Sequence, residues 1–196
     1  RTQKQGSWLF LPRGEPIRLG NIDGEAASRL ICQPVSNLIY DQGVLSRLLS
    51  LSGCSPFFLN VMCHDIVAMM MQKNYSQVSG NELGEVLKSI FSTGDHYFSH
   101  YISEAEKLNH GRELVTAISC TTKKDDEWVE RSRIEYILNK EGFYLTKGEM
   151  TLALRTISSF GIIESRKGRN EWEYRVPVGL FREWLQNTSS FSTIYN

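Results

Sequence analysis

Apolar residues recur every three or four positions along most of the chain, a spacing that places them on one face of an α-helix. Over residues 23–110 this pattern predicts four or five helices joined by short links, the organisation of a helical bundle. Residues that favour helix ends mark where each helix starts and where one is interrupted. The expected starts are Asp23, Asp41, Ser55 and Ser79, with a break at Gly94.

The segment from Ser55 to about Lys73 is apolar over much of its circumference, so we expect this helix to lie centrally. Ser55 and Pro56 are typical of the N-cap and the first helical position. Gly53 suits the left-handed residue that ends the preceding helix. Upstream, residues 7–19 have apolar residues at strand spacing and are predicted to be extended.

Beyond residues 109–111 the pattern changes to three helices followed by two alternating segments, which indicate a β-hairpin. A last short helix is expected to begin at Pro177. This order is that of a winged helix-turn-helix domain. The fold class predicted is therefore mainly α. The first of the three helices contains Leu114–Ile118, the second extends from about Asp126 to Lys140, and the third starts at the capping box Thr146–Glu149. The two strands of the hairpin are expected at 162–164 and 172–176.

Composition excludes several classes of protein. Hydrophobic residues make up 41% of the 196 positions, enough for a packed core, and 22 basic residues balance 22 acidic ones. No apolar run approaches the roughly 18 residues that a membrane span needs, so no membrane partner is expected. The four cysteines lie far apart and are interpreted as reduced thiols, which favours a cytoplasmic location. The chain begins at Arg1 without a secretory signal and is interpreted as a piece of a longer protein.

Motifs for catalysis are missing from the sequence. There is no G-x-x-x-x-G-K-[ST] phosphate loop, no G-x-S-x-G elbow and no H-E-x-x-H pair. The chain by itself is therefore not predicted to be an enzyme. His96 and His100 share a helical face beside Asp95, but no complete ligand set accompanies them, so surface histidines are favoured over a metal site.

Basic side chains in the second half suggest a possible contact with nucleic acid, since they can neutralise phosphates. Residues 112–196 nevertheless hold 13 basic and 12 acidic side chains, a weaker bias than DNA-binding modules usually show. Protein packing is therefore favoured over nucleic acid for the hairpin. The candidate contacts are Lys147, Arg155, Arg166, Lys167 and Arg169.

Several stretches resemble one protein family. Ile17–Asp23 and Leu51–Leu59 are similar to the end of the nucleotide-binding core and to the lid turn of STAND-class AAA+ ATPases. Leu30–Val35 and Ile39–Asp41 fit the intervening helix and its tyrosine-containing link. Arg182–Leu185 matches the R-x-W-[LI] signature that often ends the winged helix following the lid. The resemblance covers roughly residues 7–187.

The resemblance implies a division of the chain and a function. Residues 1–22 would be a remnant of the ATPase core, 23–110 the helical lid bundle, 111–187 the winged helix and 188–196 a flexible tail. The chain would act as a nucleotide-dependent conformational switch and protein-interaction module. ATP or ADP and magnesium would be bound in the parent protein, with no cofactor in this chain alone. Its partners would be the missing N-terminal core and effector or sensor domains or proteins.

The resemblance also implies which residues lie near the nucleotide: Gly53, Ser55, Pro56 and Phe57. The physical chemistry agrees, because a helix start presents unpaired N–H groups to a phosphate-bearing ligand, while Pro56 and Phe57 offer a flat apolar surface. Cys54 stands where the family has a second glycine, and no lysine or arginine occurs from Pro56 to Gln72. A purely structural helix cap remains open for Ser55 and Pro56. A DNA-binding winged-helix regulator and a protein scaffold without a nucleotide are the alternative functions.

Overall fold

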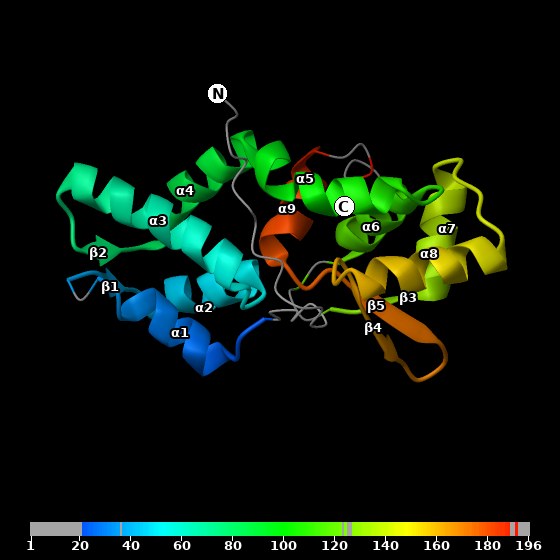
Figure 1. The fold of residues 1–196 in the computed structure, drawn as a ribbon, viewed down its shortest axis with the longest axis horizontal. Coiled ribbons are helices and arrows are strands. Elements are labelled where there is room, and N and C mark those ends of the chain that lie inside the picture. Colours follow the sequence, from blue (N-terminus) through cyan, green and yellow to red (C-terminus); the bar gives the residue numbers. More distant parts are fainter. Residues whose placement is uncertain (1–20, 36, 123, 125–126, 189–190, 192–196) are drawn as a thin grey trace, which may run out of the picture.

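The computed structural model describes residues 21–35, 37–122, 124, 127–188 and 191. The extended segment predicted at 7–19, and with it most of the expected core remnant, lies outside these residues. The described chain is mainly helical, as the periodicity predicted, and it contains two small sheets, whereas the sequence predicted only one hairpin in its second half. Figure 1 shows α1 to α4 on one side of the molecule, α6 to α8 on the other, and α9 between them.

The first half contains five helices and one two-stranded sheet among the described residues. Their starts follow the predicted caps: the Asp23 carboxylate accepts a hydrogen bond from the Ala26 N–H at 2.8 Å, and Ser79 and Glu82 form a capping box. The break at Gly94 is confirmed. The elements are α1 (Gly24–Cys32), β1 (Ile39–Tyr40), α2 (Gln42–Ser52), α3 (Pro56–Lys73), β2 (Gln77–Val78), α4 (Gly80–Ser92) and α5 (Gly94–Glu106); β1 and β2 are parallel, with Ile39 opposite Gln77.

The second half combines four helices with an antiparallel sheet in the order β3-β5-β4. The predicted capping box at Thr146 and Glu149 is confirmed: the Thr146 hydroxyl accepts from the Glu149 N–H at 3.2 Å. The elements are α6 (Gly111–Thr121), β3 (Val129–Glu130), α7 (Arg131–Lys140), α8 (Lys147–Ser159), β4 (Glu164–Lys167), β5 (Trp172–Arg175) and α9 (Gly179–Thr188).

Two of the predicted helix starts are wrong. The helix expected from about Asp126 begins at Arg131, because Val129 is buried and pairs with Tyr174 as a third strand beside the hairpin. Helical periodicity cannot detect a two-residue strand of this kind. The last helix begins at Gly179 rather than at Pro177, whose backbone packs against Gly53 instead.

A continuous apolar core joins the two halves. Phe98 of α5 lies between two side chains of α9, with ring centroids 5.1 Å from Phe181 and 5.2 Å from Trp184. Phe58 of α3 extends the cluster, 5.7 Å from Phe98, and Tyr101 reaches it from α5. The last helix therefore packs into the first half of the chain as well as into its own. No helix in the described ranges has the length and apolar character needed to cross a bilayer.

Candidate functional site

The turn that joins α2 to α3 contains the residues for which the sequence suggested a ligand. Gly53 ends α2 in the left-handed conformation, with φ +56°. Cys54 follows with φ +57°, a region that residues other than glycine seldom adopt. Hydrogen bonds hold it there: its N–H donates to the Ser52 hydroxyl at 3.1 Å and to the Leu49 carbonyl at 3.4 Å, and its own carbonyl accepts from the Ile22 N–H at 3.0 Å. The glycine-like turn geometry is thus kept although a cysteine stands at this position.

The start of α3 lies at the surface. Ser55 is its N-cap but makes no side-chain capping bond, and Pro56 is its first residue and exposed. Phe57 is 56% exposed and touches Phe58 edge-on at 5.0 Å, whereas Phe58 itself is buried. The first turn of α3 carries no acidic side chain that would offset the positive end of its dipole. An anionic or planar group can therefore approach this helix start from outside.

Ser55 faces an open cleft of about 650 Å³, within the size range of small-molecule sites. The cleft lies between the α2–α3 turn and the end of α8 with the strand β4 that follows it. Aromatic rings, serine hydroxyl groups and the carboxylate of Glu164 line its walls. Its lining residues are Asn21, Ser55, Tyr101, Trp128, Ser158, Ser159, Phe160, Gly161, Ile163, Glu164, Ser165 and Pro177.

Burial affects the hydrogen bonding of one side chain of this cleft and the pKa of another. The Ser158 hydroxyl is shielded from solvent and has no hydrogen-bond partner among the described residues. Burial raises the pKa of Tyr101, so its phenol stays protonated and can donate a hydrogen bond well above neutral pH. The cleft can therefore offer neutral hydrogen-bonding groups beside aromatic surface.

Trp128 is a residue of the cleft that sequence analysis missed, because it was assigned to a helix. Two guanidinium groups lie over its ring, with the Cζ of Arg166 at 4.4 Å and that of Arg175 at 4.6 Å from the ring centroid. Arg166 also pairs with Glu173 at 2.7 Å, and Arg175 with Glu164 at 2.7 Å. These contacts fix the hairpin β4–β5 beside the cleft.

The other candidate nucleic-acid contacts do not converge on the cleft. Lys147 and Arg155 lie on α8 and Lys167 and Arg169 on the hairpin, and all four are exposed. None of them forms an ion pair within the described part of the chain.

The hairpin also carries a carboxylate at a helix start. Glu171 accepts hydrogen bonds from the backbone N–H of Ser132 at 3.0 Å and from its hydroxyl. The start of α7 is thereby occupied by this carboxylate, and a phosphate there would meet negative charge.

The turn is tied to α9 by close backbone contacts. A Cβ atom added to Gly53 would lie 2.6 Å from the Pro177 carbonyl oxygen, and one added to Gly179 would lie 2.8 Å from that of Ser50. Gly94 approaches α9 in the same way, since a Cβ there would lie 2.3 Å from the Trp184 ring. Glycine at these positions permits distances that a side chain would prevent.

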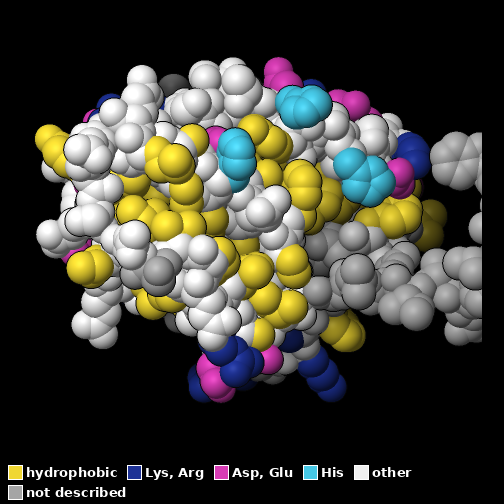
Figure 2. All heavy atoms as spheres, turned by 60° about the vertical axis from the view of Figure 1, so that its left-hand side comes forward, with side chains coloured by type: hydrophobic (Ala, Val, Ile, Leu, Met, Phe, Trp, Pro, Cys, Tyr) yellow, Lys and Arg dark blue, Asp and Glu magenta, His cyan; other side chains and the backbone are white. Residues whose placement is uncertain are grey.

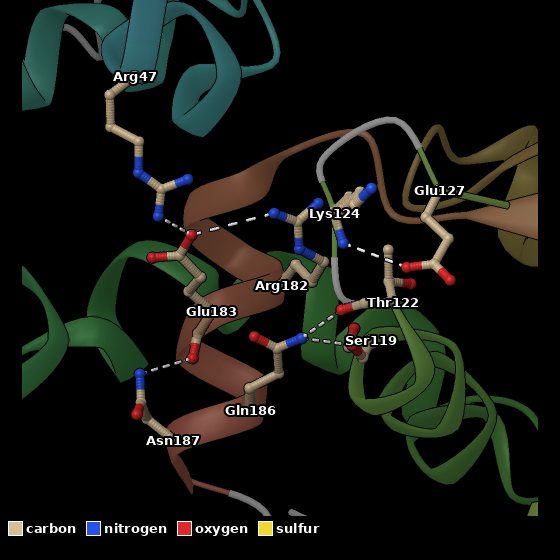
Figure 3. A network of polar contacts seen from close by, with 9 residues as sticks. All are labelled: Arg47, Ser119, Thr122, Lys124, Glu127, Arg182, Glu183, Gln186 and Asn187. Carbon is tan, nitrogen blue, oxygen red and sulfur yellow. Dashed lines mark hydrogen bonds and ion pairs between the residues drawn. The ribbon is translucent and has the colours of Figure 1, made fainter. Parts of the chain in front are cut away.

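Polar contacts complete this joint, by which we mean the packing of Pro177–Thr188 on α2, α5 and α6 (Figure 3). Glu183 of α9 forms an ion pair with Arg47 of α2. Gln186 donates hydrogen bonds to the carbonyl oxygens of Ser119 at 2.6 Å and Thr122 at 3.0 Å, at the end of α6. One helix thus holds the end of α6 and the middle of α2 together.

The histidines and cysteines of the described residues form no metal site. His96 and His100 are exposed on α5, and the described residues contain no group of three histidine, cysteine or acidic side chains that could hold a metal ion. Cys32, Cys54, Cys63 and Cys120 form no disulfide among the described residues. Burial, with the nearby Asp23 as a second cause, raises the pKa of Cys54 and keeps the turn uncharged at neutral pH.

Comparison of the chain with known protein families, with curated proteins and with solved structures gives no match. The function is therefore inferred from the chemistry and geometry of the turn, the cleft and the joint. These three features meet at Ser55 and Pro177, which line the same cleft.

Proposed function

We propose that this chain is the lid and winged-helix portion of a STAND-type ATPase and acts there as a nucleotide-dependent conformational switch and protein-interaction module. In this proposal α1 to α5 form the helical lid bundle. The helices α6, α7 and α8 with the sheet β3-β5-β4 form the winged helix, and α9 closes it.

One observation carries the proposal: the start of α3 stays outside the core although most of this helix is apolar. Pro56 and Phe57 are exposed and Ser55 lines the cleft, whereas Phe58 and Leu59 are buried. Exposed apolar rings at a helix start with free N–H groups suit the base, sugar or phosphate of a nucleotide held by another domain.

The joint gives the proposed switch a way to transmit a change. Gly53 lies directly against Pro177, and Ser50 against Gly179, so a shift of the turn must be accommodated by the segment that leads into α9. Packed backbones have little room to absorb such a shift. A nucleotide that moves the turn would therefore also move α9.

Catalysis and the cofactor are assigned to a core supplied by the parent protein. Ser55, Pro56 and Phe57 fit a contact with a base and sugar, but α3 offers no lysine or arginine to a terminal phosphate before Lys73. No phosphate loop occurs in the chain. ATP or ADP and magnesium would be held by the core, while this chain covers one side of the nucleotide.

The test uses the parent protein, extended upstream by about 200 residues, the size of an ordinary nucleotide-binding domain. We expect a phosphate-loop sequence in this region. Replacing Pro56 and Phe57 together by alanine should weaken ADP binding about tenfold in calorimetry, because it removes the apolar contact surface. Tyr75→Ala, 63% exposed beyond the other end of α3, is the matched control and should change nothing. An upstream sequence without a phosphate loop would refute the proposal.

A second function, that of a DNA-binding regulator, is supported by the four exposed cations without ion pairs, Lys147, Arg155, Lys167 and Arg169. It predicts binding to duplex DNA that falls steeply as salt is added. Lys167→Ala with Arg169→Ala should then weaken binding and reduce its dependence on salt. Fluorescence anisotropy at two ionic strengths distinguishes the two functions, since a switch without DNA contacts predicts no salt-dependent complex.

A further inference from the structure

The cleft between the two halves contains more chemistry than the proposed nucleotide contact uses. Of its lining residues, only Ser55 belongs to that contact. The cleft also differs from the side of the molecule formed by α1 to α4, where Figure 2 shows hydrophobic side chains gathered, with most acidic and basic ones toward the margins. It instead combines aromatic rings with hydroxyl groups from both halves. Its volume of about 650 Å³ suits a small molecule.

The charges at the cleft disfavour ionic ligands. Among the described residues that line it there is no lysine, arginine or histidine, and Glu164 is the only acid. The Glu164 carboxylate is paired with Arg175, whose Nε donates to it at 2.8 Å and whose Nη2 lies at 2.7 Å. Tyr101 stays neutral, because burial raises its pKa. A phosphate would meet Glu164 without a cation of its own, and an ammonium group would find this acid already paired, so an uncharged ligand is favoured.

Hydroxyl groups without partners converge on this cleft. Those of Ser55, Ser158 and Ser165, from the start of α3, the end of α8 and β4, form no hydrogen bond within the described part of the chain. The Ser158 oxygen is also shielded from solvent, and a shielded hydroxyl without a partner is unfavourable. Because Ser158 lines the cleft, a ligand there can supply the missing hydrogen bond once this side chain changes its rotamer.

Aromatic rings provide apolar surface beside these hydroxyl groups. Tyr101 is anchored edge-on against Phe181 at 5.1 Å, and Phe160 at the end of α8 is 41% exposed. The Trp128 ring already carries two guanidinium groups, which leaves Tyr101 and Phe160 for a ligand. The C–H bonds of a saturated ring are attracted to the electron-rich face of an aromatic ring, while the hydroxyl groups of that ring stay available for hydrogen bonds.

We propose that this cleft binds an uncharged, hydroxyl-bearing ring, the chemistry that sugars and nucleosides share. The ring lies against Phe160 and Tyr101, and its hydroxyl groups form hydrogen bonds with Ser158 and Ser165. The site goes beyond the proposed function, because it needs neither a phosphate nor an upstream core. Since Ser55 and Tyr101 belong to the first half of the chain and the other contacts to the second, a bound ligand would favour the arrangement in which the two halves are docked.

The experiment uses the 196-residue chain and two kinds of uncharged probe, methyl glucoside and methyl galactoside for sugars and adenosine and uridine for nucleosides. Saturation-transfer NMR detects weak binding, and a titration gives the dissociation constant. We expect at least one probe to bind with a constant of about 1 mM or lower, and the kind that binds identifies the source of the ring. Glucose 6-phosphate and AMP are the charged controls, and each should bind more weakly than its uncharged counterpart.

Two variants test whether binding occurs in the cleft. Phe160→Ala removes the exposed ring and should weaken binding at least tenfold. Ser158→Ala should weaken it about fivefold, yet leave the urea midpoint of unfolding unchanged or higher, because the hydroxyl removed has no partner in the chain alone. A purely structural role of Ser158 would not produce this pair of effects. Tyr136→Ala on α7 and Ser103→Ala on α5 remove an exposed ring and an exposed hydroxyl elsewhere, and each should change binding less than twofold.

Three results would overturn the inference: no probe binds at millimolar concentration, AMP or glucose 6-phosphate binds more tightly than its uncharged counterpart, or Phe160→Ala and Tyr136→Ala weaken binding equally. Circular dichroism verifies that each variant is folded. Because the assay contains no upstream core and changes neither Pro56 nor Phe57, its failure leaves the search for a phosphate loop and the ADP test unaffected.

Discussion

The joint at α9 and the hairpin β4–β5 are two attachments of different kinds: α9 packs on both halves of the chain, whereas the hairpin is attached within the second half. At the joint, Phe181 and Trp184 are buried against Phe98, and glycines let backbones touch. At the hairpin, Tyr174 is buried and pairs with Val129 of β3, but the other contacts are polar and partly exposed: the Arg166 and Arg175 guanidinium groups lie over the Trp128 ring and pair with acids of the opposite strand. Dense apolar packing loses several kcal/mol when disturbed, whereas exposed ion pairs contribute little.

This difference suggests which contacts could move in a switch. The hairpin contacts can be exchanged for water at small expense, because most of them are already solvated. The joint cannot open without exposing part of the common core to water. A conformational change in the proposed function would therefore keep α9 on α2 and exchange the ion pairs of the hairpin first.

The largest expected difference in stability between the joint and the hairpin is that between two tryptophan-to-alanine variants. Trp184→Ala in the joint should lower the free energy of unfolding by about 3–5 kcal/mol, since it leaves a cavity beside Phe98 and Phe181. Trp172→Ala in the hairpin, where the ring is 52% exposed, should lower it by less than about 1 kcal/mol. Urea denaturation followed by circular dichroism measures both. Equal effects would mean that the joint is no tighter than the hairpin.

Replacing two glycines by alanine should change the stability of the chain in opposite directions. Gly179→Ala should destabilise the chain by about 1–3 kcal/mol, because its Cβ would lie 2.8 Å from the Ser50 carbonyl oxygen and the backbones must separate. Gly84→Ala within α4 meets nothing within 4 Å and should stabilise the chain by about 0.5–1 kcal/mol through helix propensity. Thermal unfolding of both variants distinguishes a close contact from a simple propensity effect. If Gly179→Ala were also stabilising, the backbones at the joint would not be in contact.

Local signals in the sequence were enough to locate most of the helices. Ser79 with Glu82 and Thr146 with Glu149 mark two starts through capping boxes, and Gly53 marks the end of α2. These signals act within one helical turn, so the sequence alone can reveal them.

Contacts between residues far apart in the chain could not be predicted in this way. Val129 pairs with Tyr174 as strand β3, although its own neighbourhood reads as a helix. The approach of Gly53 to Pro177 and the place of Trp128 in the cleft likewise depend on tertiary packing. The sequence suggested Ser55, Pro56 and Phe57 as residues near a nucleotide. It could not show that Pro56 and Phe57 are exposed at the start of α3, because exposure depends on the tertiary packing.

The smallest expected effect concerns the capping boxes, one in each half. The pKa of Glu149 is lowered by hydrogen bonds from the Thr146 hydroxyl and N–H, and that of Glu82 by the same bonds from Ser79. A carboxyl whose pKa is lower in the folded state stabilises that state above its unfolded pKa, about 4.3, and loses this effect as pH falls through the folded value. The difference in unfolding free energy between the native chain and Glu149→Gln should therefore shrink between about pH 5 and pH 3. Urea denaturation across that range measures it. A difference that stays constant with pH would show that the Glu149 carboxylate does not cap α8 through its charge.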